Sequence, residues 1–286
     1  MDNDSQNNDL VIIQNAQNQQ NMEEEAPKKK TLNMNLINNV NNNLSLLSYT
    51  MYSNGSYINE RMIKICNLIK RYKPDIIALH SLKIDKYQEL YSRIINEYES
   101  TQVYKTENLE YSSVIFTKRD KIYIEKKSGN PYYFDLENSY DNNKIIGLEI
   151  TFNDKKIHII TTHFDDKEEN DNIRLEQFNI LHNMLKVENI KRAIILGNFE
   201  IMNTYEVLES HIMINANELK DIWIEAGCPS YVRNTYEDMR HERIYIYNIK
   251  KYNIISLALF GVQNISETIK VTPSNNYGLF AKINLN

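Results

Sequence analysis

Small polar residues stand where apolar runs of the chain meet turns, a position in which many α/β enzymes hold their reactive side chains. The segment Gly197-Asn198-Phe199-Glu200 directly follows the apolar run 192–196. The segment Ser274-Asn275-Asn276 precedes the apolar run 278–285, and His163 ends the run 157–162. An imidazole can transfer a proton, whereas an amide only donates and accepts hydrogen bonds. The pattern predicts the frame of a catalytic site from which much of the charge has been removed.

The elements that would position these residues are a mixture of strands and helices. Short apolar, β-branched and aromatic runs typical of strands occupy 44–49, 76–79, 113–117, 121–126, 145–152, 157–162, 192–196, 244–247, 254–260 and 278–285. Apolar residues recur at helical spacing in 58–72, 87–95 and 173–185. Helices alternate with strands and hairpin-like runs fill the middle of the chain, so the fold class is α/β with mixed sheets. Six residues are expected in the sheet cores: Leu46, Ile76, Leu79, Ile159, Ile194 and Leu196.

Composition limits the kinds of protein this chain could be. Its 286 residues can bury a substantial core, and a net charge of −5 argues against binding nucleic acid through overall charge. No apolar run reaches the roughly 18 residues of a membrane span, and the polar N-terminus is no secretory signal. Two cysteines are too few for a disulfide framework. Residues 1–43 are rich in Asn and Gln and contain no aromatic residue, so they are expected to form a disordered tail ahead of one domain spanning 44–286. We expect an intracellular protein that is not secreted and has no contact with membranes.

The ordered set of motifs resembles the endonuclease/exonuclease/phosphatase superfamily, and within it the type-2 tyrosyl-DNA phosphodiesterases. Eleven short segments carry the resemblance, in chain order: Ser48-Tyr49-Thr50, Glu60-Arg61, Pro74 to Ser81, Thr161 to Phe164, Arg174 with Gln177, Gly197 to Glu200, Glu206-Val207, Asp221-Ile222-Trp223, Gly227-Cys228-Pro229, Arg240 to Ile244, and Ser274 to Leu279. The resemblance covers nearly everything from Leu44 to Leu285. It implies a four-layer α/β/β/α sandwich in which two mixed β-sheets pack face to face and helices cover both outer faces.

The resemblance also implies a Mg²⁺-dependent phosphodiesterase site, and this chain departs from it at most catalytic positions. Ser81 stands where the family has its metal-binding Glu, and Thr50 where it has a substrate-binding Asn. Asn198 replaces the Asp that activates water, and Glu200 replaces an Asn that contacts phosphate. The terminal Asp-His pair has become Asn275-Asn276. His163 is retained as a catalytic group, and Arg174 and Glu242 stand at substrate-binding positions.

These departures predict a pseudoenzyme, a catalytically inactive homologue kept for binding or for a structural role. No cofactor and no bound metal are expected, and Mg²⁺ would be the cofactor only if activity persisted. The alternative is a divergent Mg²⁺-dependent phosphodiesterase or nuclease that acts on DNA or 5′-phosphotyrosyl-type phosphoesters. Its shifted metal site would use Glu200, Glu242 and either Asp165 or Asp166, because Mg²⁺ needs few carboxylates. An unidentified protein is the expected partner, and nucleic acid held in the old groove is the second possibility.

Overall fold

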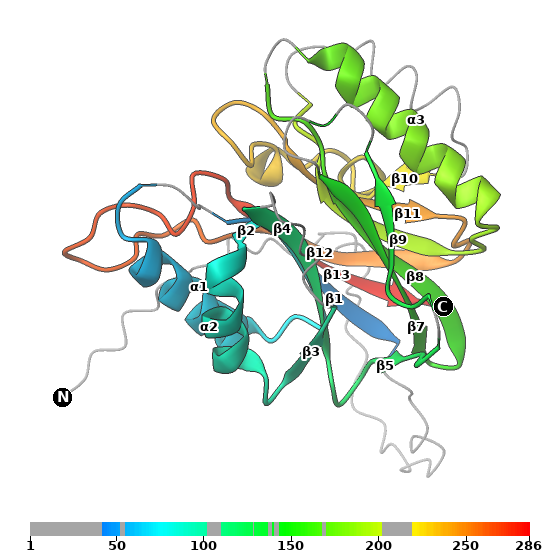
Figure 1. Cartoon of the computed structure of the whole chain (residues 1–286), viewed down its shortest axis with the longest axis horizontal. Helices are drawn as coiled ribbons and strands as arrows, with labels where there is room; N and C mark the ends of the chain where they lie inside the picture. The colour runs from blue at the N-terminus through cyan, green and yellow to red at the C-terminus, as the bar shows by residue number, and fades with distance from the viewer. Residues whose placement is uncertain are drawn as a thin grey trace, which may run out of the picture.

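Two β-sheets packed face to face, with helices on both outer faces, make up the fold (Figure 1). The computed structural model describes residues 42–51, 55–101, 110–127, 129–136, 139, 143–167, 170–201 and 219–286. The predicted α/β sandwich with two mixed sheets is therefore confirmed. Most of the predicted tail, and the Glu206-Val207 motif, lie outside the described residues. Asn42 and Asn43 were predicted as tail but belong to the fold, since the Asn42 carbonyl accepts from the Leu285 amide at 2.9 Å and Asn43 begins a strand.

The first sheet has the strand order β12-β13-β1-β2-β4-β3. Its strands are β1 (Asn43–Thr50), β2 (Ile76–Lys83), β3 (Tyr98–Ser100), β4 (Tyr111–Lys118), β12 (Tyr252–Phe260) and β13 (Gly278–Leu285). Helices α1 (Ile58–Tyr72) and α2 (Ile84–Ile94) cover its outer face, where their apolar stripes form one buried cluster with the strands.

The second sheet has the order β10-β11-β9-β8-β7-β5, with β6 paired to β7. Its strands are β5 (Tyr123–Ile124), β6 (Tyr132–Asp135), β7 (Lys144–Phe152), β8 (Lys155–His163), β9 (Ala193–Asn198), β10 (Leu219–Asp221) and β11 (Glu242–Tyr247). Helix α3 (Asp171–Val187) covers its outer face, while the short helices α5 (Ile222–Glu225) and η2 (Ser230–Val232) follow β10.

The predicted elements are found close to their expected places, with a few differences. The strand predicted over 121–126 is reduced to the two residues of β5, and the short strands β3, β6 and β10 were not predicted. Each of these is held by pairing with a longer neighbour: β5 and β6 pair with β7, β3 with β4, and β10 with β11. Short segments of this kind carry little periodic signal of their own.

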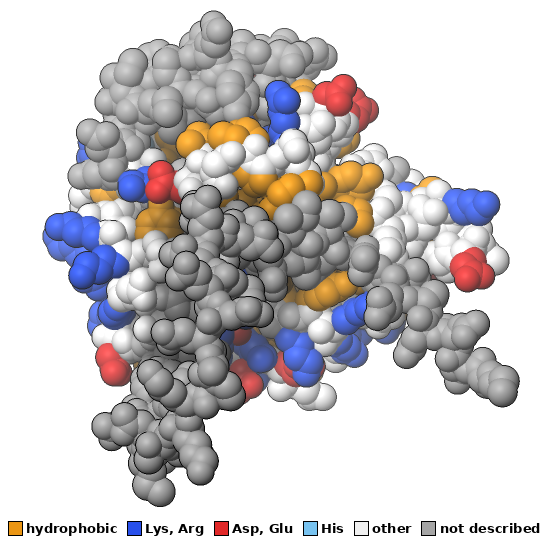
Figure 2. All heavy atoms as spheres, turned by 180° about the vertical axis from the view of Figure 1, so that it is seen from behind, with side chains coloured by type: hydrophobic (Ala, Val, Ile, Leu, Met, Phe, Trp, Pro, Cys, Tyr) orange, Lys and Arg blue, Asp and Glu red, His pale blue; other side chains and the backbone are white. Residues whose placement is uncertain are grey.

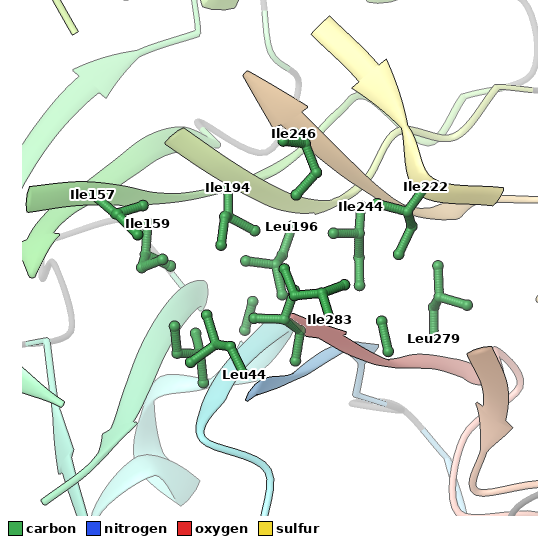
Figure 3. Packing of buried hydrophobic residues seen from close by; sticks show 14 of the residues in the cluster. Leu44, Ile157, Ile159, Ile194, Leu196, Ile222, Ile244, Ile246, Leu279 and Ile283 are labelled. Atoms are coloured by element: carbon green, nitrogen blue, oxygen red, sulfur yellow. The ribbon is translucent and has the colours of Figure 1, made fainter. Parts of the chain in front are cut away.

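Successive side chains of a strand point to opposite faces of its sheet, so every second residue enters the layer between the two sheets (Figure 3). Leu46 and Ile76 of the first sheet meet Ile159, Ile194 and Leu196 of the second, and all five are fully buried. The sixth expected core residue, Leu79, is also fully buried, but it lies on the opposite face of β2 and packs under α1 and α2.

The surface carries both signs of charge. On the side shown in Figure 2, Lys and Arg side chains lie at several places around the margin of the molecule, and apolar side chains show near the middle. None of the described helices is long and apolar enough to cross a membrane.

Candidate active site

Polar side chains continue the inter-sheet layer at one end of the strands. On the strand faces that carry Leu46, Ile159 and Leu196, the next side chains along the same face are polar. They are Ser48 and Thr50 of β1, His80 of β2, Thr161 and His163 of β8, Asn198 of β9, and Glu242 of β11. Because side chains on one face recur every second residue, the strands that build the core also aim these groups at one another.

Glu242 is the centre of the first part of this network. Its carboxylate is fully buried and accepts hydrogen bonds from the hydroxyls of Ser48 at 2.6 Å and Thr50 at 2.5 Å. Burial raises the pKa of Glu242 to about 7, although the two hydroxyls act in the opposite direction. The amide Nδ2 of Asn198 donates to Thr50 Oγ1 at 3.0 Å, so β9 joins the same network.

His80 closes the network on the β2 side. Its Nε2 lies 3.1 Å from Ser48 Oγ and 3.6 Å from Glu242 Oε2, and its ring is fully buried. Burial first, and His163 second, hold the pKa of His80 well below its usual value. His80 is therefore a neutral imidazole placed between hydroxyl groups, and it supplies no positive charge to bind a phosphate.

Glu200 is the centre of the second part of the network. Its carboxylate lies 2.9 Å from His241 Nδ1 and 3.5 Å from His163 Nε2, the second being an ion-pair distance longer than a hydrogen bond. Glu200 has a positive φ of 46°, and its backbone amide donates to Asn198 Oδ1 at 3.0 Å. The turn after β9 thus points this carboxylate back toward the two imidazoles.

The charges of Glu200 and His163 support each other. Burial would raise the pKa of Glu200, but the neighbouring His163 and His241 lower it to about 2. Burial would lower the pKa of His163, but the Glu200 carboxylate raises it above its ordinary value. The Nδ1 atom of His163 lies 2.9 Å from Ser81 Oγ. The protonated form of this histidine is therefore favoured by an anion of the protein itself.

The predicted site residues fall into two groups. Thr50, Ser81, His163, Asn198, Glu200 and Glu242 meet in the one network described above. Arg174 is fully buried in α3, where it donates to the carbonyls of Asp165 and Lys167 and pairs with Asp171. Its expected role in substrate binding is untested.

Asn275 and Asn276 stand beside the network. Asn275 is exposed, and the amide of Asn276 donates to Ser274 Oγ at 3.2 Å. Thr235 connects their loop to the start of β11. Its carbonyl accepts a hydrogen bond from the Tyr277 backbone amide, and its Oγ1 accepts one from the Glu242 backbone amide. No hydrogen bond recorded among the described residues joins either asparagine side chain to Glu242 or Glu200.

Sequence reasoning did not select Ser48, His80 or His241 as site residues. All three lie inside the motifs that carried the resemblance. A polar residue in an apolar strand, however, can be assigned to a site only when its hydrogen-bond partners are known. The available signal was polarity within a run predicted to be buried, because a buried polar group needs a partner. Ser48 and His80 fit that description.

The residues at this site do not fit a divalent metal ion. The hydroxyl of Ser81 is engaged with His163, Glu200 is paired with two imidazoles, and Glu242 is a weak acid surrounded by hydroxyl donors. In the part of the chain that is described, no group of three or more His, Cys, Asp and Glu side chains is arranged to hold a metal ion. Of the residues named for a shifted site, Asp165 is buried and accepts from the Lys167 amide, and Asp166 is exposed.

Comparison with known proteins agrees with this fold. No family model and no curated protein matches the sequence. TDP2 from D. rerio, complexed with single-strand DNA product, matches with a TM-score of 0.75 and 16% identity over 85% of this chain and 99% of that one. An endonuclease/exonuclease/phosphatase from Bacteroides vulgatus matches with a TM-score of 0.68 and 14% identity, over 85% and 99% of the two chains.

The human Nocturnin catalytic domain with bound sulfate matches with a TM-score of 0.67 and 17% identity, over 85% of this chain and 94% of that one. Identities this low show a shared fold and no more. The resemblance to the endonuclease/exonuclease/phosphatase superfamily, with TDP2 among the similar structures, is thereby confirmed for the fold.

Proposed function

We propose that this protein keeps the phosphodiesterase fold without metal-dependent phosphodiester hydrolysis, and that it acts by binding rather than by turnover. The observation that carries this proposal is the position of the Glu200 carboxylate against His163 and His241. Imidazoles that could donate to a phosphate oxygen instead face an anion that is part of the chain. A phosphate placed there would meet like charge at close range, which is unfavourable in a buried site.

The loss of basicity at Asn198 supports the same proposal. An amide stands where the resemblance implies the carboxylate that activates water, and both its oxygen and its nitrogen are engaged, with the Glu200 amide and with Thr50. Losing one electrostatic or proton-transfer group typically costs about 2.7–4 kcal/mol of transition-state stabilisation. The effects of several losses do not simply add, but together with loss of the metal they would remove most of the catalytic groups.

The test combines Mg²⁺ calorimetry with a phosphodiesterase assay on a 5′-phosphotyrosyl oligonucleotide. We expect no saturable Mg²⁺ binding and no Mg²⁺-dependent turnover above that of the His163→Ala variant. A variant carrying Ser81→Glu, Asn198→Asp and Asn275→Asp restores the three carboxylates and should bind Mg²⁺ more tightly than the natural chain. Mg²⁺-dependent turnover that disappears in His163→Ala would reject the proposal and favour the divergent phosphodiesterase.

A further inference from the structure

Five exposed cations surround a depression of about 500 Å³ at the end of the molecule opposite the candidate active site. They come from three separate segments: Lys155, the pair Lys191 and Arg192, and the pair Lys250 and Lys251. The other lining groups are Ile157, Asn248, Ile249, Leu285 and Asn286. A concentration of positive charge at one place contrasts with the net charge of −5 of the whole chain.

Strand direction explains both the convergence and the separation from the active site. β8 and β9 are parallel and β11 is antiparallel to β9, so the starts of β8 and β9 meet the end of β11 at one edge. Lys155 begins β8 and His163 ends it. At about 3.3 Å per residue, the two ends of this strand lie roughly 25 Å apart. A ligand held at the basic end therefore leaves Glu200 and Glu242 untouched.

The backbone beneath these side chains is fixed by hydrogen bonds between the three segments. Asn248 Nδ2 donates to the Lys191 carbonyl at 2.9 Å, and the Asn286 amide donates to the Lys251 carbonyl at 3.2 Å. The His158 amide donates to the Arg192 carbonyl at 3.0 Å. These contacts hold the attachment points of the exposed cations in one arrangement, which lowers the ordering cost of binding.

Several lysines elsewhere on the molecule are paired with acidic side chains. Lys73, Lys83 and Lys121 each form an ion pair with an acidic side chain, as does Lys156 in the neighbouring depression. In the described part of the chain, no ion pair is recorded for any of the five cations around the basic depression. Because grouped like charges repel one another, an anionic ligand bound here would reduce the electrostatic repulsion among the five cations.

The character of the five side chains indicates which anion would fit. They are exposed Lys and Arg side chains rather than a buried ring of donors, and no aromatic side chain lines the depression. Such a surface offers charge to phosphates spaced along a chain, but it offers neither a dehydrated cradle for one phosphate nor a platform for stacked bases. We propose that this basic surface binds the phosphate backbone of nucleic acid without reading its sequence.

The test measures binding of a fluorescent duplex of about 20 base pairs, and of its single strand, to the full chain as salt is varied. With five phosphates contacted, log K should fall with log salt at a slope of about −4.5 for the duplex and about −3.5 for the single strand. Between 50 and 200 mM salt the duplex affinity should thus drop about 500-fold. Changing the base sequence should leave the affinity unchanged.

Two double variants with equal changes in net charge make the comparison. Lys250→Gln with Lys251→Gln removes two contacts, so the slope should fall to about −2.7 and the loss over the same salt range to about 40-fold. Lys70→Gln with Lys270→Gln changes two exposed lysines elsewhere and should behave as the natural chain. His163→Ala should also leave binding unchanged, which separates this inference from the proposed function.

Three results would overturn the inference. The first is absence of salt-dependent binding, and the second is an equal effect of the two double variants. The third is tighter binding, through the same lysines, to polyglutamate or to vesicles containing phosphoinositides, which would assign the surface to an acidic protein or to a membrane headgroup instead.

Discussion

At the scale of single residues, the site is a set of charges that neutralise one another. Glu200 is held by two histidines, and Glu242 is held by two hydroxyl groups. The pKa values of the two carboxyl groups diverge to about 2 and about 7 because two imidazoles contact Glu200, whereas burial dominates at Glu242. Two carboxylates with opposite environments would suit acid–base catalysis, but here each is already engaged by the protein.

The raised pKa of Glu242 predicts how stability depends on pH. The folded protein binds the Glu242 proton more tightly than the unfolded chain does. The contribution of this carboxyl group to the free energy of unfolding is therefore fully present below pH 4.5, and it is lost as the pH rises through about 7. The whole loss is on the order of 3 kcal/mol. Glu242→Gln, which cannot ionise, should avoid it.

Urea unfolding of both proteins at pH 5 and pH 8 measures this effect. The free energy of unfolding of Glu242→Gln relative to the natural chain should be higher at pH 8 than at pH 5. Glu267→Gln, at an exposed position, should show no such difference. A relative stability of Glu242→Gln that stays constant across this range would contradict the buried, weakly acidic carboxyl group.

At the scale of elements, Arg174 joins helix α3 to the segment that follows β8. Its guanidinium is fully buried and satisfies two carbonyls of residues 165 and 167, while Asp171 at the start of the helix pairs with it. Gln177, one turn further along, accepts from the Asp165 amide at 2.9 Å. These contacts hold the exit of the strand that carries His163.

Removal of the Arg174 side chain should therefore destabilise the fold. Arg174→Ala removes the guanidinium that donates to the Asp165 carbonyl and pairs with Asp171, and breaking such a buried charged network typically costs about 3–5 kcal/mol. The Asp171 side chain is 39% exposed, so Asp171→Asn should cost about 1 kcal/mol or less. Thermal or urea unfolding distinguishes the two variants. Equal stability of Arg174→Ala and the natural chain would show that these contacts do not anchor the segment.

The elements also show how far the sequence could be interpreted without a structure. The long strands and all three long helices could be predicted because burial on one or both faces imposes a period on the residues. The short strands β3 and β10 could not, since three residues define no period and pairing with a neighbour holds them in place.

The same limit applies to the candidate site. Its strand-end positions could be predicted from Asn198 and His163, yet the contact of Glu200 with His241 could not. It depends on a positive φ at Glu200 and on the pairing of β11 with β9, which places Glu242 opposite Asn198. Such contacts arise from tertiary structure alone.

At the scale of the whole molecule, the two ends of the domain meet in the middle of one sheet. β13, the last strand, lies between β12 and β1, the first strand, and pairs with both over most of its length. Its buried residues Leu279, Ala281 and Ile283 belong to the layer between the sheets. The core that supports the candidate site is thus completed only by the final strand.

A chain that ends before Gly278 should consequently fail to form the native fold. It would lack both ladders of β13 and its share of the inter-sheet core, and β1 and β12 would be left with exposed edges. We expect no cooperative unfolding transition by circular dichroism. Within β13, Ile283→Ala should cost about 2–5 kcal/mol because it opens a cavity in the core, whereas exposed Lys282→Ala should change stability by less than about 0.5 kcal/mol. A cooperative transition in the truncated chain would mean that the sheets pack without the strand that joins the two ends of the domain.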